Sequence, residues 1–174
     1  IVATISPIKT KNLHDLEREV KKNSQCLILI LDGITDTKNF GAIVRSAECF
    51  GVDFIVISKS GNSPINGETI KSSSGAIFNV PICKVDHIKD AIYFLKEFGI
   101  KIIGSDDKGS KNLFKHNFEE KCAIIMGSEG DGIKKSILNL CDDKINIPLY
   151  GKLSSLNVSV ATGIFLSEFK RQQS

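Results

Sequence analysis

The chain has 174 residues, of which 41% are hydrophobic and 25% charged, and its formal net charge is +3. This balance is typical of one compact globular domain and excludes a disordered tail, and the weak charge excess permits a nucleic-acid partner without demanding one. The longest apolar run, residues 26–31, is too short to cross a bilayer, so a membrane-spanning protein is excluded as well.

The cysteines and histidines argue against disulfide and metal chemistry. The five cysteines are odd in number, and no two of them have the C-x-x-C spacing. The three histidines are scattered along the chain instead of following the spacings of metal ligands. We therefore expect reduced thiols in a cytoplasmic protein and no metal site.

Apolar runs typical of buried strands alternate with amphipathic patterns typical of helices. The opening segment, residues 1–25, contains one expected helix at 13–22. Strands are then expected at 27–31, 54–57, 100–103, 123–126 and 145–147, and helices at 40–50, 87–98, 131–140 and 156–171. Polar, small-residue runs between 58 and 75 predict loops. The alternation predicts an α/β domain with a mostly parallel sheet and helices on both faces.

The first segment that could carry chemistry is 32–47, which follows an expected strand. Ligands of α/β sheets usually bind just beyond the carboxyl ends of the strands. Asn39 is a suitable N-cap by residue type for the helix expected to begin near it. Arg45, on the same helix, is either a surface arginine or a clamp for phosphate, whose oxygens match the guanidinium fork.

The second segment is a glycine-rich turn after an expected strand, residues 126–133. Its glycines follow the order G-x-x-G-x-G, which differs from the dinucleotide fingerprint G-x-G-x-x-G. This difference argues against a nucleotide-dependent enzyme on an ordinary doubly wound sheet. Glycines at such a turn let backbone N–H groups approach a ligand. Glu129 either caps the following helix or faces that ligand.

The third segment is 145–163. Gly151-Lys152 is followed by Leu153, so it is no phosphate-binding P-loop, which needs Ser or Thr there. Ser155 and Asn157 are either plain helix caps or polar groups of a ligand site. The helix expected after them is rich in small residues, which allow close packing against another helix.

Taken in order, the three segments resemble the three motifs of the SpoU/TrmH family of RNA ribose 2′-O-methyltransferases. The first motif is matched by Asn39-x-Gly41-Ala42-Ile43-x-Arg45-Ser46-Ala47, the second by residues 126–130 and the third by Ile147-Pro148 through 155–161. The resemblance runs from about residue 27 to 169. It implies that the C-terminal part of the sheet fold threads a deep trefoil knot, although true knots are exceptional.

The resemblance also implies a cofactor, a partner and site residues. S-adenosylmethionine would be held largely by backbone groups at Gly127, Ile147 and Leu156. Two copies would form a homodimer with the active sites near the interface, through the helix after Asn157 and the helix that carries Arg45.

Five side chains would carry the reaction by resemblance, namely Asn39, Arg45, Glu129, Ser155 and Asn157. Arg45 would grip the phosphate beside the target ribose, and Asn39 would orient Arg45 or the ribose. Glu129 would hydrogen-bond the substrate or place negative charge near the sulfonium. Ser155 and Asn157 would shape the cofactor and substrate pockets.

Within the family, the chain is most similar to the branch that methylates a guanosine ribose of 23S ribosomal RNA. The similarity rests on Ile1-Val2-Ala3 and on residues 154–164. Relatives in this branch carry a small N-terminal RNA-binding domain that is absent from this sequence. Residues 1–174 are therefore expected to be a single catalytic domain, with 1–25 as a lead-in segment. A transfer-RNA ribose methyltransferase and a catalytically silent RNA-binding relative remain alternatives.

Overall fold

The computed structural model describes residues 8–174, so the opening Ile1-Val2-Ala3 lies outside the described residues. The fold is an α/β sheet in which every paired strand is parallel to its neighbour. Its seven strands follow the order β3-β2-β1-β6-β4-β7-β5. They are β1 (Cys26–Asp32), β2 (Phe54–Ser58), β3 (Ile82–Val85), β4 (Lys101–Ser105), β5 (Lys111–Asn112), β6 (Lys121–Gly127) and β7 (Asp143–Asn146).

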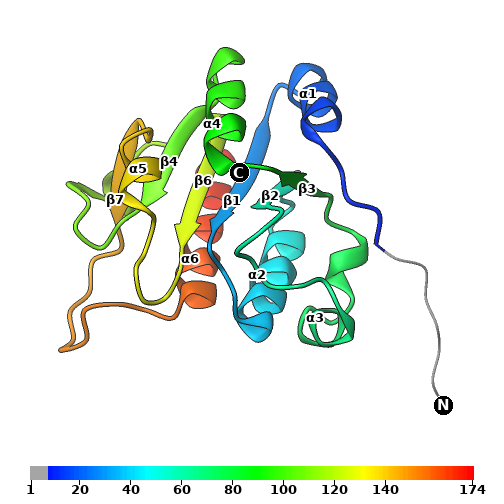
Figure 1. Ribbon diagram of the computed structural model, residues 1–174. Coiled ribbons are helices and arrows are strands. Elements are labelled where there is room, and N and C mark those ends of the chain that lie inside the picture. Colours follow the sequence, from blue (N-terminus) through cyan, green and yellow to red (C-terminus); the bar gives the residue numbers. More distant parts are fainter. Residues whose placement is uncertain (1–7) are drawn as a thin grey trace.

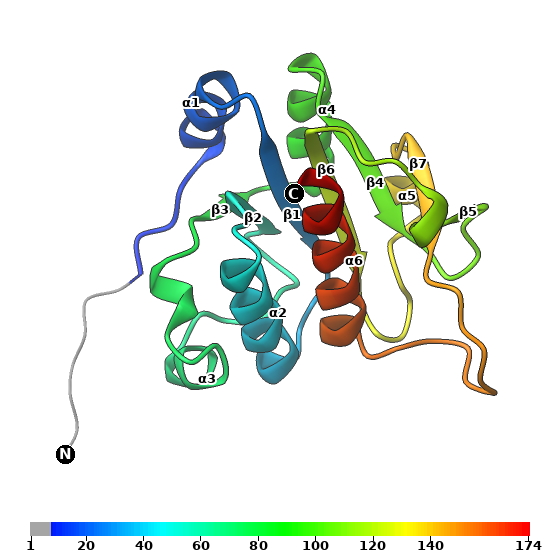
Figure 2. The same cartoon turned by 180° about the vertical axis from the view of Figure 1, so that it is seen from behind.

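Helices cover both faces of this sheet, as the sequence predicts (Figures 1 and 2). One face packs against α2 (Thr37–Cys49), α3 (Gly67–Ser72) and α6 (Val158–Gln173). The opposite face packs against α1 (Leu13–Lys22), α4 (Ile88–Glu97) and α5 (Lys135–Leu138). All seven residues of β1 are buried, because alternate side chains enter the two cores. A strand covered on both faces is apolar along most of its length, which explains the continuous run at 26–31 before Asp32.

The strand order reverses between β1 and β6. From β1 the chain moves outward to β2 and β3 at one edge of the sheet. It then crosses back past β1, and the remaining four strands form the other half of the sheet. Asp32 at the end of β1 lies beside Gly127 at the end of β6. A crevice at such a topological switch point is the usual ligand site of an open α/β sheet.

Two expected helix starts are wrong, and local hydrogen bonds explain both. The first helix after β1 begins at Thr37, where Asp36 is the N-cap and accepts from the Asn39 N–H at 2.7 Å, so Asn39 lies inside the helix. The helix expected at 131–140 is only Lys135–Leu138. Its expected first turn forms a tight loop, because Gly132 adopts a φ of +66° and bonds back to Ser128.

The sequence patterns missed three short elements. The strand β3 contains only four residues and includes the partly exposed Lys84, so it lacks a clear apolar run. The strand β5 contains two residues and forms only by pairing with β7. The helix α3 lies inside the region expected to be loop, where the side chain of Asn66 caps its first turn.

The cysteines are free, and the described part of the chain shows no sign of a metal centre. All five thiols are unpaired, and burial raises the pKa of Cys83 and Cys141 to about 11, which keeps them protonated and unreactive. Within residues 8–174, no three potential metal ligands gather into a site, and no helix has the length and apolar character needed to cross a membrane.

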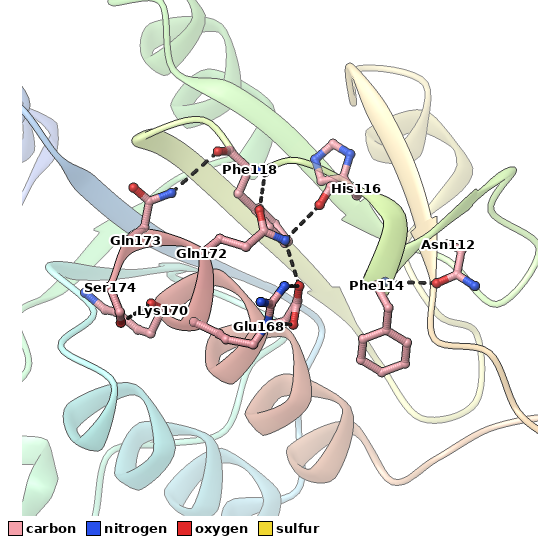
Figure 3. A network of polar contacts seen from close by, with 10 residues as sticks. Asn112, Phe114, His116, Phe118, Glu168, Lys170, Gln172, Gln173 and Ser174 are labelled. Carbon is pink, nitrogen blue, oxygen red and sulfur yellow. Dashed lines mark hydrogen bonds and ion pairs between the residues drawn. The ribbon is translucent and has the colours of Figure 1, made fainter.

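The last turns of α6 are tied to the segment before β6 by a polar network (Figure 3). The Gln172 side chain donates to the His116 carbonyl at 2.8 Å and accepts from the Phe118 N–H at 2.8 Å. Arg171 donates twice to the Glu168 carboxylate, at 2.7 and 2.8 Å, and Gln172 donates to it at 2.7 Å. The network fixes the C-terminal helix on the sheet.

Replacing Glu168 by glutamine should remove an acid-dependent part of this stability. Hydrogen bonds from Arg171 and Gln172 lower the pKa of Glu168 to about 2 from 4.5, so its stabilising effect is present above pH 4.5 and is lost as the pH falls toward 2. Because Arg171 is largely exposed, we expect a loss of about 1 kcal/mol in the unfolding free energy at pH 7. Urea unfolding of both proteins should show this difference shrinking below pH 4.5. A difference that stays constant from pH 7 to 3 would contradict the assignment.

Candidate active site

A cavity of about 340 Å³ lies at the switch point between β1 and β6. Its walls are the loop 33–36 after β1, the first turn of α2, the loop after β6 and the start of α6. Two residues expected in the site, Asn39 and Glu129, line it together with Val158. Segments that are far apart in the sequence therefore lie near one another at the carboxyl edge of the sheet (Figure 2), and the cavity is between them.

The loop after β6 is a tight hairpin that presents Glu129. Ser128 and Gly132 exchange two backbone hydrogen bonds at 3.0 and 3.1 Å, and the Ser128 hydroxyl accepts from the Asp131 N–H at 3.3 Å. The hairpin folds so closely over the end of β6 that a Cβ on Gly127 would lie 2.1 Å from the Gly132 carbonyl carbon. Only glycine fits at 127, which explains why the strand ends in this residue.

The variant Gly127→Ala should destabilise the protein and Gly130→Ala should not. The alanine methyl group at 127 meets backbone on the opposite arm, which cannot rotate away, so we expect a loss of about 2–3 kcal/mol in the unfolding free energy. A Cβ at 130 would have no neighbour within 4 Å. Urea unfolding of the two variants measures the difference. Equal losses would show that the hairpin does not pack tightly on Gly127.

Asn157 connects the three predicted motifs. Its side-chain oxygen caps α6 by accepting from the Ser159 N–H at 2.9 Å and the Val160 N–H at 3.4 Å. Its side-chain nitrogen donates to Asn39 Oδ1 at 3.0 Å and to Glu129 Oε1 at 2.5 Å. The oxygen and the nitrogen of this amide thus have different tasks. The N–H groups of α6 face its oxygen, and the oxygens of Asn39 and Glu129 face its nitrogen, so these partners fix its orientation. Of the two interpretations left open for Asn157, the helix cap is observed, and the bonds to Asn39 and Glu129 place the same side chain beside the cavity.

Two expected members stay outside this cluster. Arg45 is exposed on the third turn of α2 and forms no hydrogen bond or ion pair with any described residue. It follows Asn39 by six positions, which turns its side chain about 120° round the helix axis from the Asn39 side. Ser155 is exposed in the loop before α6 and forms no hydrogen bond within residues 8–174. The geometry leaves both side chains available to a molecule that binds from outside.

The three positions expected to hold the cofactor lie at element ends. Gly127 is buried at the end of β6, Ile147 follows β7 and packs against the core under α2 and α6, and Leu156 is 38% exposed just before α6. From the residue after Ile147 to Leu156 itself, residues 148–156 form no backbone hydrogen bond with any described residue. Their N–H and C=O groups are therefore open to a ligand or to water.

Sequence reasoning missed two residues that build this site. Asp36 caps α2 and lines the cavity. The Ser159 hydroxyl donates to Asn157 Oδ1 at 2.5 Å and so supports the amide from the helix side. The signal for Asp36 was present, since aspartate three residues before a helical Asn39 is a capping pattern. No local pattern marks Ser159.

A model of the SpoU rRNA Methylase family matches residues 26–167, a stretch that contains the cavity and all three motif segments. The chain belongs to this family. A 23S rRNA (guanosine-2′-O-)-methyltransferase, RlmB of Vibrio vulnificus, is 38% identical over 99% of this chain and 70% of its own length. RlmB of Escherichia coli is 36% identical over 100% of this chain and 72% of its own length.

Solved structures agree with the family assignment. A TrmH-family RNA methyltransferase structure from Porphyromonas gingivalis superposes with a TM-score of 0.78 at 31% identity over 85% of this chain. The SpoU methyltransferase AviRb from Streptomyces viridochromogenes, in complex with AdoMet, gives 0.82 at 25% identity over 90% of this chain. The chain spans 60% and 64% of the length of those two proteins.

Proposed function

We propose that this chain transfers a methyl group from S-adenosylmethionine to the ribose 2′-hydroxyl of a guanosine in 23S ribosomal RNA, in the cytoplasm. The observation that carries the proposal is the hydrogen-bonded cluster of Asn39, Glu129 and Asn157 at the switch-point cavity. Family membership supplies the reaction class. The full-length similarity to two RlmB proteins supports ribosomal RNA as the substrate.

The segment around Leu156 fits a nucleoside cofactor. Backbone groups of residues 148–156 lack partners within residues 8–174 and can bond a polar ligand. Leu149 and Leu153 are exposed beside them, and apolar side chains of this kind cover an adenine ring well. When bound, S-adenosylmethionine supplies a methyl group already activated by a sulfonium, so the reaction needs no metal and no covalent intermediate.

The chain's own residues would bind and orient the RNA. Asn157 holds the Glu129 carboxylate at the cavity, where its oxygens can accept hydrogen bonds from ribose hydroxyls. Arg45 would grip the phosphate beside the target ribose, because a guanidinium binds phosphate with two parallel hydrogen bonds. Arginine gives up its proton poorly, so we assign it phosphate binding and electrostatic help to the departing proton. Orientation of this kind can supply about 7–11 kcal/mol of barrier reduction in favourable cases.

The proposal includes a homodimer. Three apolar side chains are exposed in this part of the chain, Tyr150 (94% exposed) and Leu153 in the loop before α6 and Val160 on α6. Ala161 and Gly163 on α6 are small, and Gly163 faces α2 of the same chain, so α2 and α6 would meet a second copy as one close-packed pair. The helices α2 and α6 lie side by side on one face of the sheet, so this interface would also take in the helix that carries Arg45 (Figure 2).

The proposal also includes a trefoil knot in the C-terminal part of the chain. Its support is family membership together with the path of the chain after β7. There an extended segment leads from the carboxyl edge of the sheet to α6, which returns along β6 on the face opposite α5 (Figures 1 and 2).

Calorimetric titration and a methyl-transfer assay test this function. We expect saturable binding of S-adenosylhomocysteine and none of NAD, followed by transfer of labelled methyl from S-adenosylmethionine to a guanosine ribose in a 23S ribosomal RNA transcript. Transfer only to transfer-RNA transcripts would replace the substrate, and cofactor binding without transfer to either RNA would indicate a silent relative. Binding of NAD alone would overturn the proposal.

A further inference from the structure

A buried carboxylate lies at the switch point but outside the cavity. Asp32 is the last residue of β1 and only 2% exposed. Alternation along β1 directs its side chain to the face covered by α4 and α5, whereas the cavity with Glu129 opens on the face of α2 and α6. A carboxylate is rarely this buried unless it is paired and hydrogen-bonded, so its partner indicates its task.

That partner is the far arm of the loop that carries Glu129. Asp32 Oδ2 accepts from the backbone N–H of Lys134 at 2.9 Å, and Oδ1 lies 3.3 Å from Lys134 Nζ. The Lys134 side chain is 70% exposed, so its ion pair is screened by water, and the backbone hydrogen bond is the specific contact. Residue 134 is the last one before α5, so Asp32 holds the loop where it joins the sheet.

The loop therefore spans the edge of the sheet from one face to the other. Its tip, Glu129, lines the cavity on the α6 side, while Ile133 packs into the core on the α5 side. The Ser128–Gly132 bridge makes the part between these residues a single hairpin. A shift of Lys134 would thus move the hairpin as a unit and displace the Glu129 carboxylate from Asn157.

We propose that Asp32 is a positioning residue. By fixing the Lys134 backbone it keeps the Glu129 carboxylate within hydrogen-bond distance of Asn157. This inference rests on the proposed function, because it concerns how the cluster is prepared for RNA. The Asp32 carboxylate and the cavity that Glu129 lines are on opposite faces of the sheet, so Asp32 would act on the cluster through the loop.

The test compares Asp32→Ala with Asp32→Asn, which keeps an oxygen that can accept from the Lys134 N–H. Asp32→Val serves as a second variant that fills the space and favours a strand, in case alanine prevents folding. Lys134→Ala is the matched control, because it removes the ion pair but keeps the backbone donor. The methyl-transfer kcat, the KM for a 23S ribosomal RNA transcript and the hydrogen exchange of the amides of residues 128–134 are measured for each.

We expect Asp32→Ala and Asp32→Val to lower kcat at least tenfold with little change in KM, and to speed amide exchange in 128–134 but not in β1. Asp32→Asn should recover most of the rate, and Lys134→Ala should retain it. In a double-mutant cycle, Asp32→Ala should cost much less when Glu129 is already glutamine.

Equal costs of Asp32→Ala with and without Glu129→Gln would overturn the proposal, and so would an unchanged kcat beside a lower stability. If the wild-type chain transfers no methyl group, the proposed function fails, and the exchange of residues 128–134 still decides whether Asp32 holds the loop.

Discussion

The variant Arg45→Ala is expected to lower the rate of methyl transfer about 100-fold or more, while the affinity for S-adenosylhomocysteine and the unfolding free energy hardly change. Arg45 is exposed and has no polar partner among the described residues, so the fold loses little when it is shortened. Its position six residues after Asn39 turns it about 120° round the helix axis from the cluster. It also forms no hydrogen bond with residues 147–156, where the cofactor is expected. The loss should therefore fall on the step that aligns the RNA.

Two further variants separate a phosphate clamp from a general loss of positive charge. Arg45→Lys keeps the charge but not the guanidinium fork, so we expect part of the rate to return. Arg18→Ala, an exposed arginine on α1 across the sheet, should leave the rate unchanged. Removing one phosphate contact should also make RNA binding less dependent on salt, with the slope of log K against log salt falling by about one. Loss of cofactor binding in Arg45→Ala would show that the phosphate role is wrong.

The strands and long helices of this protein could be predicted because their signals are local. The helix expected at 87–98 is observed as Ile88–Glu97, since its apolar residues recur on one face. The same rule fails at 131–140, where Ile133 and Ile137 also stand four apart. There the backbone bonds between Ser128 and Gly132 hold residues 128–132 in a hairpin, so the helix is only the single turn Lys135–Leu138.

The site could be predicted only in part, because its contacts are not local. The bond between Asn39 and Asn157 joins residues 118 positions apart, and no periodicity connects them. The family resemblance named these two side chains together with Glu129, and hydrogen bonds through Asn157 connect the three in the structure. It did not show that one amide would both cap α6 and bridge the other two, or that Arg45 would face outward. Such details depend on how α2 and α6 pack on the same side of β1 and β6.

The variant Asn157→Asp separates the two tasks of this amide. An aspartate oxygen can still accept from the Ser159 and Val160 N–H groups, and negative charge is favourable at the start of a helix, so the cap is kept. The other oxygen replaces the donor and faces the Glu129 carboxylate and the Asn39 carbonyl oxygen, which repel it. We expect the unfolding free energy to change by less than about 1 kcal/mol and the methyl-transfer rate to fall about 100-fold at pH 8.

The pH dependence of that variant provides the decisive measurement. Two carboxylates within hydrogen-bond distance cannot both ionise easily, so one of them takes up a proton at a raised pKa and becomes a donor again. The rate of Asn157→Asp relative to wild type should therefore rise as the pH falls from 8 toward 5. Asn66→Asp, the same change at the cap of α3, keeps its two backbone acceptor bonds and should leave the rate unchanged at every pH. If Asn157→Asp retained the wild-type rate at pH 8, the bridge between Asn39 and Glu129 would not be needed for methyl transfer.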